Sequence, residues 1–134
     1  MPDHHAALVY AMVLASAADC DMSDAELRTI GEIVDFLPVF QDFDRARLTA
    51  TVADCAALLD NDEGLDTVLG LIYRVLPEHL HETAYALACD VVACDLEAKQ
   101  EELRLLELMR HALGIDRLSA AAIERGARAR FATV

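Results

Sequence analysis

The stretch Asp19–Arg28, DCDMSDAELR, carries the signals that start a helix. Ser23 and Glu26 form an S-x-x-E pattern, in which the hydroxyl and the carboxylate each accept a hydrogen bond from a backbone N–H at the helix N-terminus. Apolar residues then recur at the spacing of one helical face, at Leu27, Ile30, Val34 and Leu37. The pattern predicts a helix that begins near Ser23 and ends before Pro38.

The rest of the chain favours helix as well. It has 134 residues, of which 55% are hydrophobic, and it contains only five glycines and three prolines. No stretch alternates polar and apolar residues with the period of a strand. This length suits a single domain, residues 1–134, that can bury a core of its own. Within it we expect a first helix with Leu8, Met12 and Ala15 on one face, and Ser119 as the cap of the last helix.

A second copy of the opening stretch lies 76 positions later, at Asp95–Arg104, DLEAKQEELR. Four aligned pairs are identical, namely Asp19/Asp95, Glu26/Glu102, Leu27/Leu103 and Arg28/Arg104. Self-similarity at a fixed spacing is the signature of an internal repeat. We therefore predict an all-α, single-domain bundle of about seven helices, in which a pseudo-twofold repeat relates the helix-turn-helix units 5–37 and 83–113.

The two copies share the acidic pattern D-x-[DE]-x4-E at a helix–turn–helix corner. If the corners converge, Asp19, Glu26, Asp95 and Glu102 form the candidate metal site, with Asp21 and Glu97 as secondary candidates. Carboxylates gathered at one place repel one another unless a cation or protons intervene, and all-oxygen sites suit Ca²⁺, Mg²⁺ or Mn²⁺. The alternative is that these acids only cap their helices and face solvent.

The two corners resemble the TerB-like tellurite-resistance family, whose corners read roughly A-D-G-x-[VI]-x-x-x-E. The matching stretches are Ala18–Glu26 and Cys94–Glu102, and the resemblance extends over about residues 5–115. It implies an all-α bundle, binding of a divalent cation (Ca²⁺, Mg²⁺, Mn²⁺ or Zn²⁺) by the paired acids, and a non-enzymatic part in bacterial tellurite resistance and stress response. Cys20 and Leu96 stand where the family has turn glycines.

The charge of the chain defines the alternative function. The net charge is −13, and residues 1–66 alone carry −11. Nucleic-acid binding needs clustered Lys and Arg, and anionic membranes repel such a chain, so neither is expected. The acidic run Asp60–Asp66 is a solvated loop or a docking patch for a protein partner with a basic surface. The alternative function is therefore an acidic helical interaction module with no metal site.

Other chemistry is sparse in the sequence. No phosphate-binding loop, nucleophile elbow or H-E-x-x-H motif is present, so we expect no enzyme, and a metal-assisted hydrolase using the acids is the weakest hypothesis. The apolar stretch 4–18 is too short to span a bilayer, and the start MPDHH lacks the positive charge of a secretory signal, which favours a cytoplasmic location. We expect exposed histidines at positions 4, 5, 79 and 81.

Overall fold

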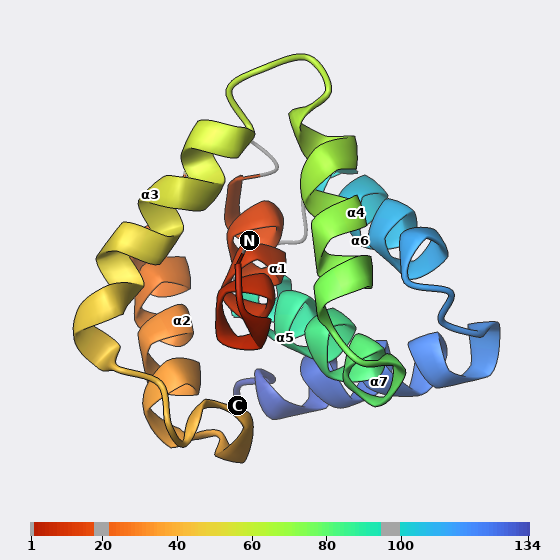
Figure 1. The fold of residues 1–134 in the computed structure, drawn as a ribbon. Coiled ribbons are helices and arrows are strands. Elements are labelled where there is room, and N and C mark those ends of the chain that lie inside the picture. Colours follow the sequence, from red (N-terminus) through yellow and green to blue (C-terminus); the bar gives the residue numbers. More distant parts are fainter. Residues whose placement is uncertain (1, 18–21, 95–99) are drawn as a thin grey trace.

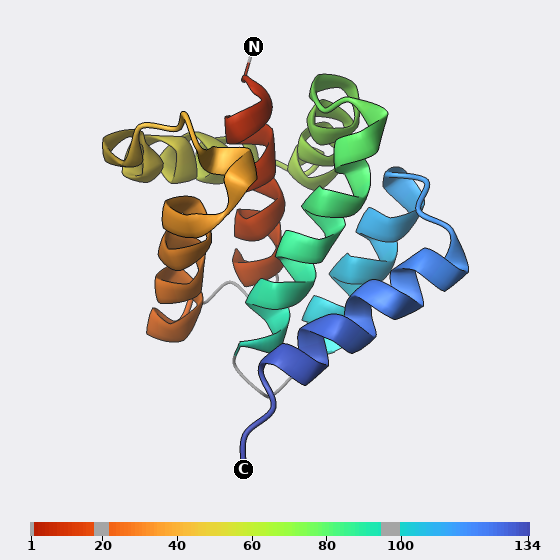
Figure 2. The same cartoon turned by 90° about the horizontal axis from the view of Figure 1, so that it is seen from below.

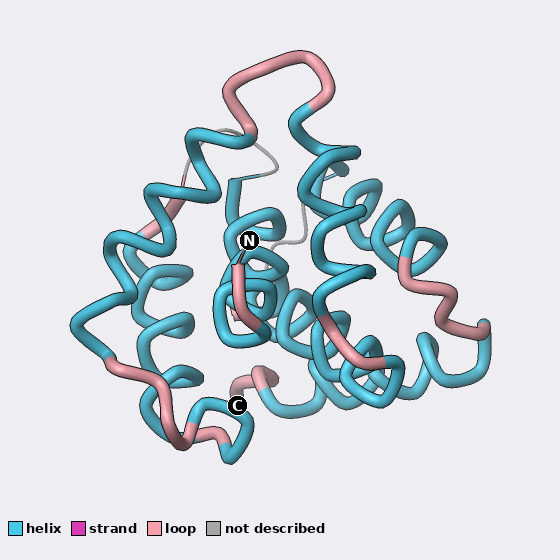
Figure 3. The backbone as a smooth tube through the Cα atoms, in the orientation of Figure 1, coloured by secondary structure: helices cyan, strands magenta, loops and turns pink. Residues whose placement is uncertain are grey.

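The computed structural model describes residues 2–17, 22–94 and 100–134. These residues form α-helices and three short 3₁₀-helices and contain no strand (Figures 1 and 3), which confirms the predicted all-α bundle of about seven helices. The α-helices are α1 (His4–Ala17), α2 (Asp24–Phe36), α3 (Leu48–Leu58), α4 (Gly64–Val75), α5 (His81–Ala93), α6 (Gln100–Ala112) and α7 (Arg117–Arg130). None of the described helices is long and apolar enough to cross a membrane.

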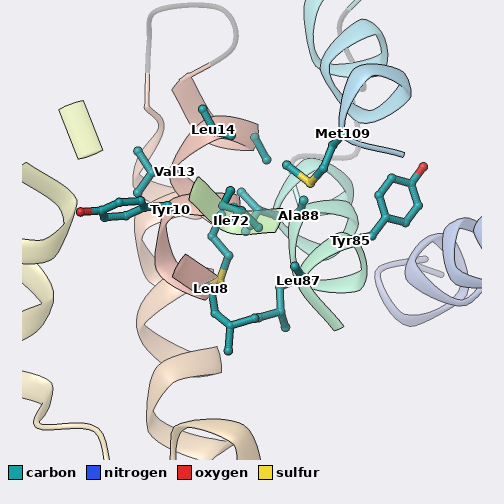
Figure 4. Packing of buried hydrophobic residues seen from close by; sticks show 14 of the residues in the cluster. Leu8, Tyr10, Val13, Leu14, Ile72, Tyr85, Leu87, Ala88 and Met109 are labelled. Atoms are coloured by element: carbon teal, nitrogen blue, oxygen red, sulfur yellow. The ribbon is translucent and has the colours of Figure 1, made fainter. Parts of the chain in front are cut away.

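Helix α1 is the centre of the bundle. Every residue from His5 to Ser16 is buried, and the helix packs against α2, α3, α4, α5 and α6. The prediction of one apolar face was too narrow, because a helix surrounded on all sides must be apolar all round. Figure 4 shows Leu8, Val13 and Leu14 of this helix among Ile72 of α4 and Leu87 and Ala88 of α5.

Helix α5 is the main neighbour of α1 and carries α6 and α7 on its other sides (Figure 2). The ends of α1 and α5 and the beginnings of α2 and α6 lie at one end of the bundle, the lower end in Figure 2. The last residue of α2, Phe36, lies 76 positions before the last residue of α6, Ala112. The internal repeat and its pseudo-twofold symmetry both stay predictions.

Three local predictions are wrong. Asp116, not Ser119, caps the last helix, because the Asp116 carboxylate accepts the Ser119 backbone N–H at 3.0 Å. Hydrogen bonds from the side chain and the backbone of Ser119 lower the pKa of Asp116, with the side-chain bond the larger cause. His5 and His81 are buried rather than exposed. The ring Nε2 of His5 lies 3.0 Å from the Val39 carbonyl oxygen, and that of His81 lies 3.2 Å from the Tyr73 and Leu76 carbonyl oxygens, so both rings satisfy loop or helix-end carbonyls.

The turn after α6 depends on a glycine. Gly114 has a φ of 68°, in the left-handed region, and its backbone N–H donates to His111 O at 3.2 Å. We expect Gly114→Ala to lower the free energy of unfolding by about 1 kcal/mol, because an L side chain is strained there. Gly70→Ala in α4 is the control, since its φ is not positive and the added methyl group meets only ordinary contacts. It should be neutral or stabilising in the same urea titrations, and equal losses in both variants would contradict this account of the turn.

Candidate acidic helix corners

Two buried glutamates mark the beginnings of α2 and α6. Glu26 is the third residue of α2, Glu102 lies in the first described turn of α6, and each residue is only 2% exposed. The acidic neighbours Asp24 and Glu101, in the same first turns, are exposed. If the corners were only solvated, all of these acids would face water. Burial instead distinguishes Glu26 and Glu102, the glutamates that the predicted repeat aligns, from their acidic neighbours.

The hydrogen bonds of Glu26 account for one of its two carboxylate oxygens. Glu26 Oε1 accepts the Ser23 backbone N–H at 2.9 Å, while Ser23 Oγ accepts the Glu26 backbone N–H at 3.1 Å. This is the capping box that the sequence predicts. The second oxygen, Oε2, is also buried and has no hydrogen-bond partner among the described residues. A buried polar atom without a partner is costly, so the capping box alone does not explain this carboxylate.

The setting of both corners favours negative charge. Each glutamate lies in the first turn of a helix, where the exposed backbone N–H groups and the helix dipole attract anions. Helix α2 and the described part of α6 begin at the same end of the bundle (Figure 2). Corners placed in this way can supply oxygen ligands from two directions, which is the arrangement that a hard divalent cation uses.

The remaining candidate ligands lie outside the described residues. Asp19, Asp21, Asp95 and Glu97 fall within 18–21 and 95–99, so of the six candidates the structure places Glu26 and Glu102. Residues 2–17, 22–94 and 100–134 by themselves contain no group of three or more His, Cys, Asp or Glu side chains that could hold a metal ion. A site at the corners therefore needs the aspartates in addition to the two glutamates.

The described cysteines do not form a competing metal centre. Burial raises the pKa of the Cys55 and Cys89 thiols to about 12, so both stay protonated near neutral pH. A protonated thiol is a poor metal ligand. The third described cysteine, Cys94, donates its S–H to the Val91 carbonyl oxygen at 3.0 Å. Cys55 and Cys89 act as small apolar groups of the core, and Cys94 is half-buried.

One further feature was missed at the sequence level. The Tyr85 hydroxyl donates a 2.6 Å hydrogen bond to Glu124 Oε2, which joins α5 to α7 over a separation of 39 residues. This bond and burial together raise the pKa of Tyr85 far above its ordinary value, with burial the larger cause. Nothing in the local sequence around either residue indicates the pairing, because only the packing of α7 on α5 creates it.

Comparison with known proteins does not assign the chain to a family. We find no match among protein-family models, curated proteins or solved structures. The resemblance to the TerB-like family therefore stays a prediction that depends on the two acidic corners.

Proposed function

We propose that this protein is a non-enzymatic, divalent-cation-binding helical domain of the TerB-like type, acting in tellurite resistance or stress response. Asp19, Glu26, Asp95 and Glu102 supply the ligands, with Asp21 and Glu97 in supporting positions. The observation that carries the proposal is the burial of Glu26, whose Oε2 has no partner among the described residues, and of its counterpart Glu102. A cation would neutralise carboxylates that are otherwise costly to bury.

The donor set decides which ions fit. Carboxylate oxygens are hard ligands, and they suit Ca²⁺, Mg²⁺ and Mn²⁺ better than metals that prefer thiolate or imidazole. Zn²⁺ accepts carboxylates too, so it belongs in the same test. In this reading the cation joins the two corners and stabilises the end of the bundle where α2 and α6 begin.

A second candidate function is an acidic interaction module with structural corners. Asp60, Asp62, Glu63 and Asp66, at the loop between α3 and α4, are exposed, and none of them has an ion-pair partner among the described residues. Such a surface attracts a partner with a basic face, and salt weakens that attraction. The two functions separate cleanly, because only the first requires the buried glutamates to be charged and metal-bound.

The aspartates, which the structure leaves undescribed, give the functional test. Calorimetric titration of the metal-stripped protein with Ca²⁺, Mg²⁺, Mn²⁺ and Zn²⁺ should give saturable binding with a Kd below about 1 mM for at least one ion. Asp19→Asn and Asp95→Asn should each weaken that binding by about tenfold or more. Asp24→Asn, an exposed change of the same charge, is the control. Binding that survives both variants unchanged would exclude the proposed ligand set.

A further inference from the structure

A cavity lies between α5, α6 and α7. Helices α6 and α7 both pack against α5 but scarcely touch each other, so the surface of α5 between them is left open as a floor. The resulting cavity has a volume of about 480 Å³. Figure 4 shows Tyr85 pointing from α5 to the side opposite Leu8, toward this space between α6 and α7. Cavities of this size are typical of small-molecule sites.

The inner wall of the cavity is apolar. Cys89 and Val92 of α5, Leu106 of α6 and Ala120 and Ala127 of α7 line it, and all five are buried. The small alanines of α7 keep the space open, because a larger side chain at either position would extend into it. The wall therefore suits an aliphatic chain, which gains free energy when it leaves water.

The charges at the cavity reverse those of the protein. Among the described residues, three arginines, Arg110, Arg117 and Arg128, line it against two glutamates, Glu107 and Glu124, although the whole chain has a net charge of −13. The larger cavity next to Tyr73 and His81 shows the opposite balance, because its described lining holds three acids and no Lys or Arg. An arginine surplus around an apolar cavity in so acidic a protein favours an anionic ligand.

The arginines at the cavity differ in the hydrogen bonds and ion pairs that they form. Nη1 of Arg110 donates to the Ile115 carbonyl oxygen at 3.3 Å, which fixes this guanidinium at the junction of α6 and α7. Arg117, at the first position of α7, is exposed and forms no ion pair with a described residue. Glu124 already accepts the Tyr85 hydroxyl. The junction end of the cavity therefore offers guanidinium groups to a carboxylate, which they bind well.

We propose that this cavity binds a small amphipathic monocarboxylate, an aliphatic chain that ends in a carboxylate. The chain lies on Cys89, Val92 and Leu106, and the carboxylate meets Arg117 at the junction of α6 and α7. Neither of the two described candidate metal ligands, Glu26 and Glu102, lines the cavity, although Leu103, the residue after Glu102, does.

Decanoate, below its micelle concentration, is the probe for this site. Calorimetric titration of the full chain should give saturable 1:1 binding with a Kd below about 1 mM. Arg117→Gln should weaken it by about tenfold, the loss of one charged hydrogen bond. Arg125→Gln, an exposed α7 change outside the cavity lining, should not. Decylammonium, with the same chain and the opposite charge, should not bind.

A substitution that fills the cavity gives a second, independent test of the proposal. Ala121 lines the cavity and is exposed, so Ala121→Phe should abolish decanoate binding without unfolding the protein. Ala122→Phe, on the same exposed helix but outside the lining, is the matched control and should bind normally, with circular dichroism confirming that both fold. Three results would each overturn the proposal: no saturable binding, equal binding by the two Phe variants, or equal binding of decylammonium.

Discussion

Leu8→Ala should lower the free energy of unfolding by about 3–4 kcal/mol, because the central helix cannot close around the cavity that the change leaves. Leu8 is 0% exposed and lies on α1, which packs against α2 to α6. Neighbouring helices on every side fix the space around the side chain, so relaxation into it is limited. For a domain of this size the loss is a large fraction of the total stability. Urea unfolding followed by circular dichroism measures it.

The matched control for this prediction is Leu118→Ala. The chemical change is the same, but Leu118 is 81% exposed at the start of α7. We expect a change within about 0.5 kcal/mol, as for most surface substitutions. A Leu8→Ala variant as stable as Leu118→Ala would mean that α1 is not the centre of the core.

Glu26→Gln should remove the stabilisation that a divalent cation gives, while leaving the metal-free protein as stable as the parent or more so. Glutamine keeps a side-chain oxygen for the capping box, which accepts Glu or Gln at this position. It also removes a buried negative charge whose Oε2 has no described partner. A cation present at 100 times its Kd adds about 2.7 kcal/mol to the parent protein, and the variant should lose most of that.

Thermal unfolding with and without the cation separates the two effects. Glu32→Gln is the control, because Glu32 is on the same helix, is exposed and loses the same charge. It should keep the cation-dependent rise in Tm. If Glu26→Gln shows the same rise as Glu32→Gln, Glu26 is not a ligand. If instead Glu26→Gln destabilises the metal-free protein, the carboxylate has a structural role that glutamine does not supply.

Local signals in the sequence predicted the helices well. The Ser23–Glu26 capping box was expected from residue type alone and is present. The cap of the last helix was predicted wrongly, because Asp116 and Ser119 are both good N-cap residues and the sequence does not show which of them the helix uses. The signals at a helix end are short-range, so they predict that a helix is present better than they predict its exact first residue.

Features that depend on distant residues were beyond the reach of the sequence. His81 is buried because its ring meets carbonyl groups at the end of α4, and no pattern around it indicates this. The cavity between α6 and α7 was not predicted either, because it forms only where both helices pack against α5. The candidate metal site was predicted only in part. The repeat aligned Glu26 with Glu102, and the structure adds that both are buried, which composition alone would not predict for glutamate.

The most direct test of the central claim is the stoichiometry of cation binding at the corners. Equilibrium dialysis of the metal-stripped protein against Ca²⁺, Mg²⁺, Mn²⁺ and Zn²⁺ should show one ion bound per chain for at least one of them. The double variant Glu26→Gln/Glu102→Gln should lose that ion, and Glu32→Gln/Glu107→Gln, with the same change of charge at exposed positions, should retain it. No saturable uptake below about 1 mM of any of the four ions, or equal uptake by the two double variants, would contradict the account.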